Sequence, residues 1–187
     1  PSSPPMAAQS PNEEGPSLQD DINSVLKTYK ALIKPIQQAD IDQFLATSEK
    51  VNAWLESNIE AQRKLDNMAG PNRWKHVQEL GIPVLQNGDT LLIQAMRMKM
   101  AEKASKSDLW THAQDELKKI TAKEAELNHK LSRLPPKRKQ MAAAVIDKTK
   151  ALFETIANYP RANAELYKQN VKKINAGFIL LTRLGPV

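Results

Sequence analysis

Residues 110–134 read WTHAQDELKKITAKEAELNHKLSRL, and this stretch decides the fold. Its apolar side chains recur at alternating spacings of three and four residues, the heptad pattern of a coiled coil or a long bundle helix. The stripe comprises Trp110, Ala113, Leu117, Ile120, Leu127, Leu131 and Leu134, with Glu124 as its one charged member. We expect one helix over about 107–134, and opposite Glu124 either a Lys or Arg of a partner helix or solvent.

Similar stripes lie on both sides of this segment, separated by Pro and Gly residues that end helices. The predicted helices cover about 17–34, 36 or 40 to 68, a short stretch around 74–80, 90–104, 137–158 and 160–184. Because short connections make successive helices antiparallel neighbours, the sequence predicts an all-α fold. We expect an elongated up-and-down bundle of five to six substantial helices.

Two stripes are candidate faces for binding another helix. The first is the stripe of residues 110–134, and the second consists of Tyr167, Val171, Ile174, Phe178 and Leu181. The predicted helix 90–104 is apolar on most sides, which indicates a central core helix or an interface helix. Its residues Met96, Met98 and Met100 fit gap-filling core, with an adaptable binding face as the alternative.

The N-terminal segment has a different composition from the rest of the chain. Residues 1–16 contain five prolines and almost no side chain that a core would bury, so we expect a disordered tail. We assign residues 17–187 to a single helical domain. Within it, only residues 82–89 have strand or turn character, with a turn signal at Asn87-Gly88.

The charges are distributed unevenly along the chain, whose net charge is +6. Residues 1–96 hold 8 Lys/Arg and 12 Asp/Glu, whereas residues 97–150 hold 14 and 7. The densest cluster is Lys137, Arg138 and Lys139, which opens the predicted helix 137–158. Cations beside the N–H groups of a helix N-terminus can form an anion site. The alternatives are a solvated loop and a nuclear-import-like signal.

The sequence contains no pattern typical of catalysis. There is no cysteine, and His76, His112 and His129 are isolated from one another, so no metal site or cofactor is predicted. Neither a nucleophile motif nor a Gly-rich phosphate loop occurs. Among the aromatic residues, Trp54 and Trp110 lie on apolar stripes and predict core packing. Trp74 has polar and basic neighbours and is the best candidate for an exposed aromatic side chain.

These observations favour a non-enzymatic structural or scaffolding protein that assembles through helix faces, with itself or with other helical chains. The alternative is a nucleic-acid- or polyanion-binding protein, nucleocapsid-like, that uses the basic region 97–150. A basic helical surface lying on an anionic membrane is a third hypothesis. Neither a secretory signal nor a membrane-length apolar run is visible. We therefore expect an intracellular protein, cytoplasmic or nuclear, or one inside a virus particle.

Overall fold

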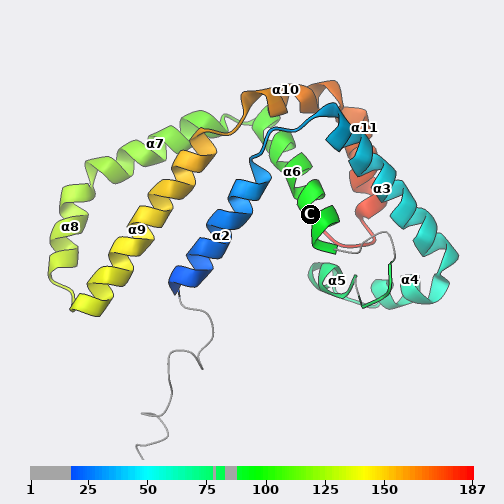
Figure 1. The fold of residues 1–187 in the computed structure, drawn as a ribbon, viewed down its shortest axis with the longest axis horizontal. Coiled ribbons are helices and arrows are strands. Elements are labelled where there is room, and N and C mark those ends of the chain that lie inside the picture. The colour runs from blue at the N-terminus through cyan, green and yellow to red at the C-terminus, as the bar shows by residue number, and fades with distance from the viewer. Residues whose placement is uncertain (1–17, 78, 83–87) are drawn as a thin grey trace, which may run out of the picture. The chain divides into compact units, whose positions relative to one another are not determined.

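The computed structural model describes residues 18–77, 79–82 and 88–187 (Figure 1), which form ten α-helices and no strand. The all-α prediction is confirmed. The helices are α2 (Leu18–Leu32), α3 (Gln38–Ser57), α4 (Ile59–Asp66), α5 (Gly70–His76), α6 (Gly88–Lys106), α7 (Leu109–Ala122), α8 (Glu124–Ser132), α9 (Pro136–Ala157), α10 (Arg161–Gln169) and α11 (Val171–Leu181). The predicted tail 1–16 and turn residue Asn87 lie outside the described residues.

The predicted count of five to six helices is too low, because three predicted helices are each interrupted by one residue. Asn58 separates α3 from α4, Lys123 separates α7 from α8, and Asn170 separates α10 from α11. At the two asparagines the side chain takes over a helical hydrogen bond. Asn58 Nδ2 donates to the Trp54 carbonyl at 2.7 Å, and Asn170 Nδ2 donates to the Leu166 carbonyl at 2.9 Å. A short amide that bonds the backbone in this way competes with helix continuation.

The contacts group the described chain into two compact units, whereas the sequence suggested no boundary within 17–187. Among the described residues, unit 1 contains residues 18–31 and Leu109–Tyr159, and unit 2 contains those of Leu32–Asp108 and Pro160–Val187.

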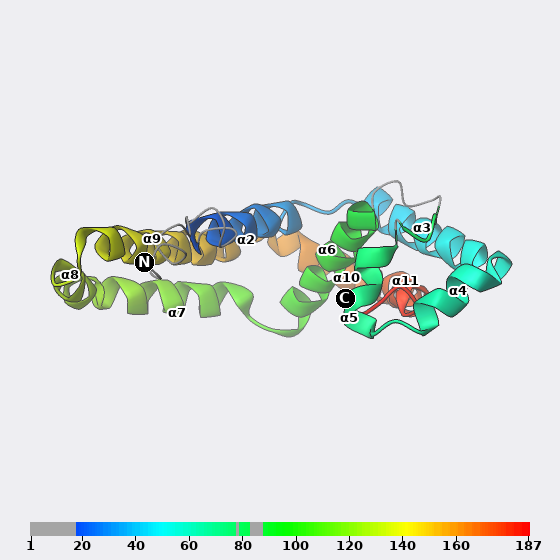
Figure 2. The ribbon, with the colours of Figure 1, turned by 90° about the horizontal axis from the view of Figure 1, so that it is seen from below.

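Unit 1 is built around a helical hairpin. The α7 helix packs against α9, and α8 carries the chain from one arm to the other, as Figure 2 shows. At the open end of the hairpin, the Trp110 indole N–H donates to the Tyr159 carbonyl at 2.7 Å, and the two ring centroids lie 6.2 Å apart. This hydrogen bond joins the first turn of α7 to the chain just after α9. At the other end of the hairpin, Pro136 stands in the first turn of α9, where its missing N–H costs nothing.

Unit 2 is a packed helical core. Its main contacts join α3 to α11 and α6 to α10, and α3 also contacts α6. The α6 helix supplies buried residues along its length and is a central core helix, one of the two roles that its all-round apolar character indicates. These buried residues are Leu91, Ala95, Met98, Ala101 and Ala104. Met98 is therefore core, as expected.

Amide side chains fix the connections of unit 2. Asn163 is almost fully buried, accepts a hydrogen bond from the Ile36 N–H at 2.9 Å, and donates to the Lys34 carbonyl at 3.0 Å. It thereby holds the backbone on both sides of Pro35, which has no donor of its own. Gln38 and Asn170 exchange two amide hydrogen bonds, of 2.9 and 3.0 Å, between α3 and the break after α10.

Candidate functional site

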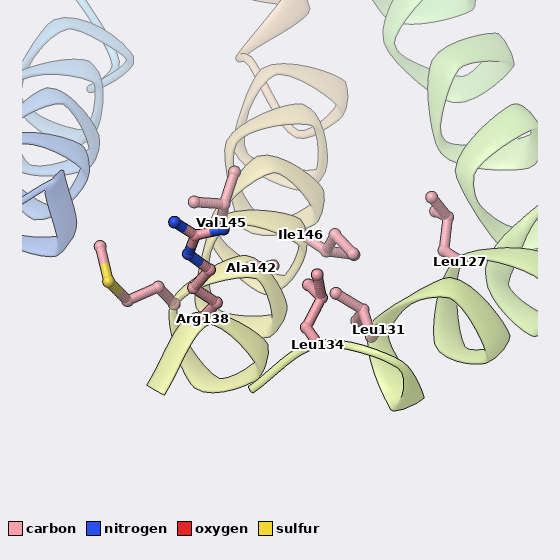
Figure 3. A pocket seen from close by; sticks show the side chains of 8 residues that line it. Leu127, Leu131, Leu134, Arg138, Ala142, Val145 and Ile146 are labelled. Atoms are coloured by element: carbon pink, nitrogen blue, oxygen red, sulfur yellow. The ribbon is translucent and has the colours of Figure 1, made fainter. Parts of the chain in front are cut away.

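The strongest candidate site is an apolar groove in unit 1, between α8 and α9 (Figure 3). Its volume is about 510 Å³. The lining residues are Leu127, Leu131 and Leu134 on one side and Arg138, Met141, Ala142, Val145 and Ile146 on the other. In Figure 3, Leu131 and Leu134 point toward Ile146, and the Arg138 side chain lies beside Val145. Seven of the eight lining side chains are therefore apolar.

The side chains of this groove are covered to different degrees. Leu131 is buried, with 9% of its surface exposed, whereas Leu134 and Met141 are 36% and 46% exposed. The remaining apolar lining residues are half-buried. Exposed large apolar side chains gathered in one hollow are typical of an interaction site rather than of ordinary surface.

The α9 helix explains why the groove exists. Not one of its 22 residues is buried, although its face carries Met141, Val145, Leu152, Phe153 and Ile156. Of these apolar residues, Met141 is exposed and the other four are half-buried. A helix of this length inside a finished core normally buries a full stripe. Unit 1 therefore presents an apolar face that it covers only in part.

An ion pair lies one helical turn beyond the groove. Lys150 of α9 donates to the Glu124 carboxylate of α8 at 2.6 Å. This hydrogen bond raises the pKa of Lys150, with smaller contributions from the charges of Glu124, Asp147 and Glu154. The interruption of the stripe at Glu124 is thus explained by a lysine from the neighbouring helix, one of the two outcomes that the sequence predicted.

Five cations and no carboxylate lie between residues 127 and 146: Lys130, Arg133, Lys137, Arg138 and Lys139. Lys130 pairs with Glu126 at 3.2 Å, and Arg133 contacts the His129 ring at 3.2 Å. By contrast, Lys137, Arg138 and Lys139 are exposed and form no ion pair with any described residue. The predicted polyanion contact is therefore an accessible cationic cluster, and Arg138 places it at the groove.

The first predicted interface stripe is divided by the helix break at Lys123. Trp110 is buried at the open end of the hairpin, and Leu117 and Ile120 are half-buried on α7. Leu127, Leu131 and Leu134 belong to α8 and the turn after it, and all three line the groove. The continuous helix expected over 107–134 was wrong, but its C-terminal third does contribute to the candidate site.

The second predicted stripe is used inside unit 2. Tyr167, Ile174 and Leu181 are buried in the core, and Phe178 packs against it. Burial raises the pKa of the Tyr167 hydroxyl, and the charge of Glu102 adds to this effect. Val171 alone of this stripe is exposed, at 37%. The structure therefore brings only one of the two stripes to an open surface.

Of the α9 wall of the groove, the sequence singled out only Arg138. Met141 and Val145 were recognisable as one face of the predicted helix 137–158, but so were the faces of the other helices. What distinguishes them is that they are covered only in part: Met141 is exposed and Val145 is half-buried, and the spacing of apolar residues does not indicate this. Trp74, the candidate exposed aromatic, is half-buried; its indole N–H donates to the Pro186 carbonyl at 3.0 Å.

Other kinds of site find no support among the described residues. No group of three or more His, Asp or Glu side chains there is arranged to hold a metal ion. In the same part of the chain, no helix combines the length and apolarity needed to cross a bilayer. Comparisons with protein-family models, curated proteins and solved structures found no match to this chain.

Proposed function

We propose that the chain is a non-enzymatic scaffolding subunit that assembles with a helical partner, and that the groove between α8 and α9 is its docking face. The observation that carries this proposal is the incomplete burial of α9, a helix of 22 residues without one buried side chain. Burying apolar surface contributes about 25 cal/mol per Å². A partner that covered Leu134 and Met141 would gain this contribution.

The packing of unit 2 indicates that the two units have different roles. Its interface candidates on α10 and α11 are already packed against α3 and α6. Because its core is closed, unit 2 serves as the stable part of the protein, and the half-covered hairpin of unit 1 binds the partner. The partner is then either another helical chain or a second copy of this one.

The test is to map the assembly on the protein itself. The tagged full chain would be isolated together with its natural partners, and hydrogen exchange would be compared between the assembled and the separated chain. We expect added protection in α8 and α9, and loss of the assembly in the double variant Leu134→Asp, Met141→Asp. A matched control, Ile59→Asp with Ile179→Asp, changes two exposed apolar residues of unit 2 and should keep the assembly. Protection confined to unit 2, or an unaffected groove variant, would contradict the proposal.

The second candidate function, polyanion binding, is favoured by the exposed cluster Lys137, Arg138 and Lys139. It would bring a steep fall of affinity with salt, because each neutralised phosphate releases counterions. Titration of RNA or DNA against the chain at two salt concentrations tests it. Binding that is lost on changing the three cations to Ala supports this function. Equal binding by the variant opposes a role for the cluster.

A further inference from the structure

The walls of the groove repeat with the period of a helix. On α8 and the following turn, the lining leucines are spaced by four and three residues; on α9 the lining residues recur at the same spacing. Two such ridges side by side form a channel along the helix axes. From Arg138 to Ile146 this channel is about 12 Å long at 1.5 Å per residue, which is about two helical turns. A third helix packs into a channel of this kind with residues at i, i+3 or i+4, and i+7.

The charge beside the channel restricts what the third helix can carry. Five Lys and Arg residues and no Asp or Glu occur between residues 127 and 146. Lys137, Arg138 and Lys139 are exposed and have no ion pair with a described residue. A helix with Lys or Arg on its flanks would be repelled here, and one with Asp or Glu would be attracted.

We propose that the groove binds an acidic amphipathic helix: three apolar residues at i, i+3 or i+4, and i+7 enter the channel, and Asp or Glu residues beside them face Lys137, Arg138 and Lys139. This proposal rests on the proposed function and adds the chemistry of the partner. The apolar residues line a hollow, whereas a membrane surface is met by a protruding apolar face. Apart from Arg138, which belongs to the cationic cluster, the channel wall is apolar and offers no polar group to read a base, so nucleic acid would contact only its cationic side.

The probe is a synthetic 20-residue peptide with Leu at the three anchor spacings and Glu, Gln and Ala elsewhere. A second peptide replaces every Glu by Lys, and a third carries Pro at its centre to prevent helix formation. Binding of each labelled peptide to the full chain is followed by fluorescence anisotropy. We expect the acidic peptide to bind at least about tenfold more tightly than the other two, a difference of about 1.4 kcal/mol.

Charge reversal is the decisive variant, because it predicts a reversed preference and not merely a loss of binding, and the net-charge control separates this result from non-specific attraction. The triple variant Lys137→Glu, Arg138→Glu, Lys139→Glu should bind the Lys peptide more tightly than the Glu peptide. The control Lys64→Glu, Lys75→Glu, Lys172→Glu changes the net charge equally at exposed sites of unit 2. It should keep the preference of the natural chain. The variant Met141→Asp should weaken binding of the acidic peptide at least about tenfold.

Equal binding of the Glu and Lys peptides, or a control triple variant that also reverses the preference, would overturn the proposal. It would also fall if anionic lipid vesicles or RNA bind and the acidic peptide does not. These results are separable from failure of the proposed function. If hydrogen exchange maps the natural assembly to α8 and α9 but the peptides show no preference, only the proposal of an acidic partner helix is rejected. If the added protection lies outside α8 and α9, both the proposed docking face and the acidic partner helix are rejected.

Discussion

Gly177 of α11 lies directly against the ring of Phe44 of α3. A β-carbon at position 177 would come within 2.5 Å of Phe44 Cε2, and the ring itself is fully buried. The ring also meets Phe178 edge-on, with centroids 5.5 Å apart. Since the Phe44 ring is enclosed on these sides, it has little room to shift. This contact between α3 and α11 therefore requires a residue without a side chain.

Gly177→Ala should destabilise the protein, although alanine is the better helix former. Overpacking a core costs about 1–3 kcal/mol, which outweighs the roughly 1 kcal/mol that Ala gains over Gly in a helix. Urea unfolding measures the difference. Gly70→Ala is the matched control, because its β-carbon would meet Pro186 at an ordinary 3.6 Å. A Gly177→Ala protein as stable as the natural one would show that α3 and α11 are not so closely packed.

Asn163→Ala should cost about 2–4 kcal/mol of unfolding free energy. The substitution leaves the Ile36 N–H and the Lys34 carbonyl without their partner, and because both groups are only partly buried, each costs about 1–2 kcal/mol, the lower part of the range for an unpaired buried group. Thermal or urea unfolding provides the measurement. The control is Asn67→Ala, at an exposed position. If the two substitutions had equal effects, Asn163 would not be holding the backbone around Pro35.

The sequence predicted the helical class, because this depends on local patterns of side chains. For α6 it left a core helix and an interface helix open, and for Glu124 a Lys or Arg partner and solvent; in each case the structure shows the first. The prediction failed at Asn58, Lys123 and Asn170, where one residue ends a helix inside an unbroken stripe. The spacing of apolar residues indicates which face of a helix is apolar, but it does not indicate whether the helix continues through a given residue. At Asn58 and Asn170 a signal existed, since asparagine readily bonds the backbone. Lys123 offered none.

The candidate site was only half predictable for a related reason. Leu127, Leu131 and Leu134 were identified because they share a heptad pattern. Yet the equally clear stripe of Tyr167, Ile174 and Leu181 is enclosed by other helices of unit 2. Whether a stripe stays open depends on which helices fold over it. That information lies in long-range contacts and not in the spacing of one segment.

Lys173→Ala removes the salt-bridge partner of Asp42, and we expect this loss to change the Asp42 pKa and the stability of the protein at acid pH. The hydrogen bond from Lys173, helped by one from Gln38, holds the Asp42 pKa below its ordinary 3.8. A depressed carboxyl pKa contributes stability above the ordinary pKa, and this contribution disappears as the pH falls through the lowered value. Carboxyl-carbon NMR should show the Asp42 pKa rising in Lys173→Ala. It should not move in Lys172→Ala, and a rise in both would contradict the pairing.

Lys150 should show the opposite dependence. Its pKa is raised above the ordinary 10.5 by the hydrogen bond to Glu124. The stability contributed by this pair is therefore complete below pH 10.5 and is lost as the pH rises through the raised value. In Glu124→Gln, NMR titration should find the Lys150 pKa lowered. Glu126→Gln removes only the partner of Lys130 within α8, so it should leave Lys150 unchanged. The same drop in both variants would show that general charge is responsible.

Leu131 and Met141 line the same groove but should respond differently to truncation. Leu131 is buried, so Leu131→Ala should cost about 2–3 kcal/mol through lost burial and the cavity it leaves. Met141 is 46% exposed, so Met141→Ala should cost less than about 0.5 kcal/mol in the isolated chain. Urea unfolding of the two variants, at a protein concentration where the chain is monomeric, measures both. If Met141→Ala were as costly as Leu131→Ala, the methionine would already be covered in the unbound protein. The groove would then be closed, and no partner helix would gain apolar surface by entering it.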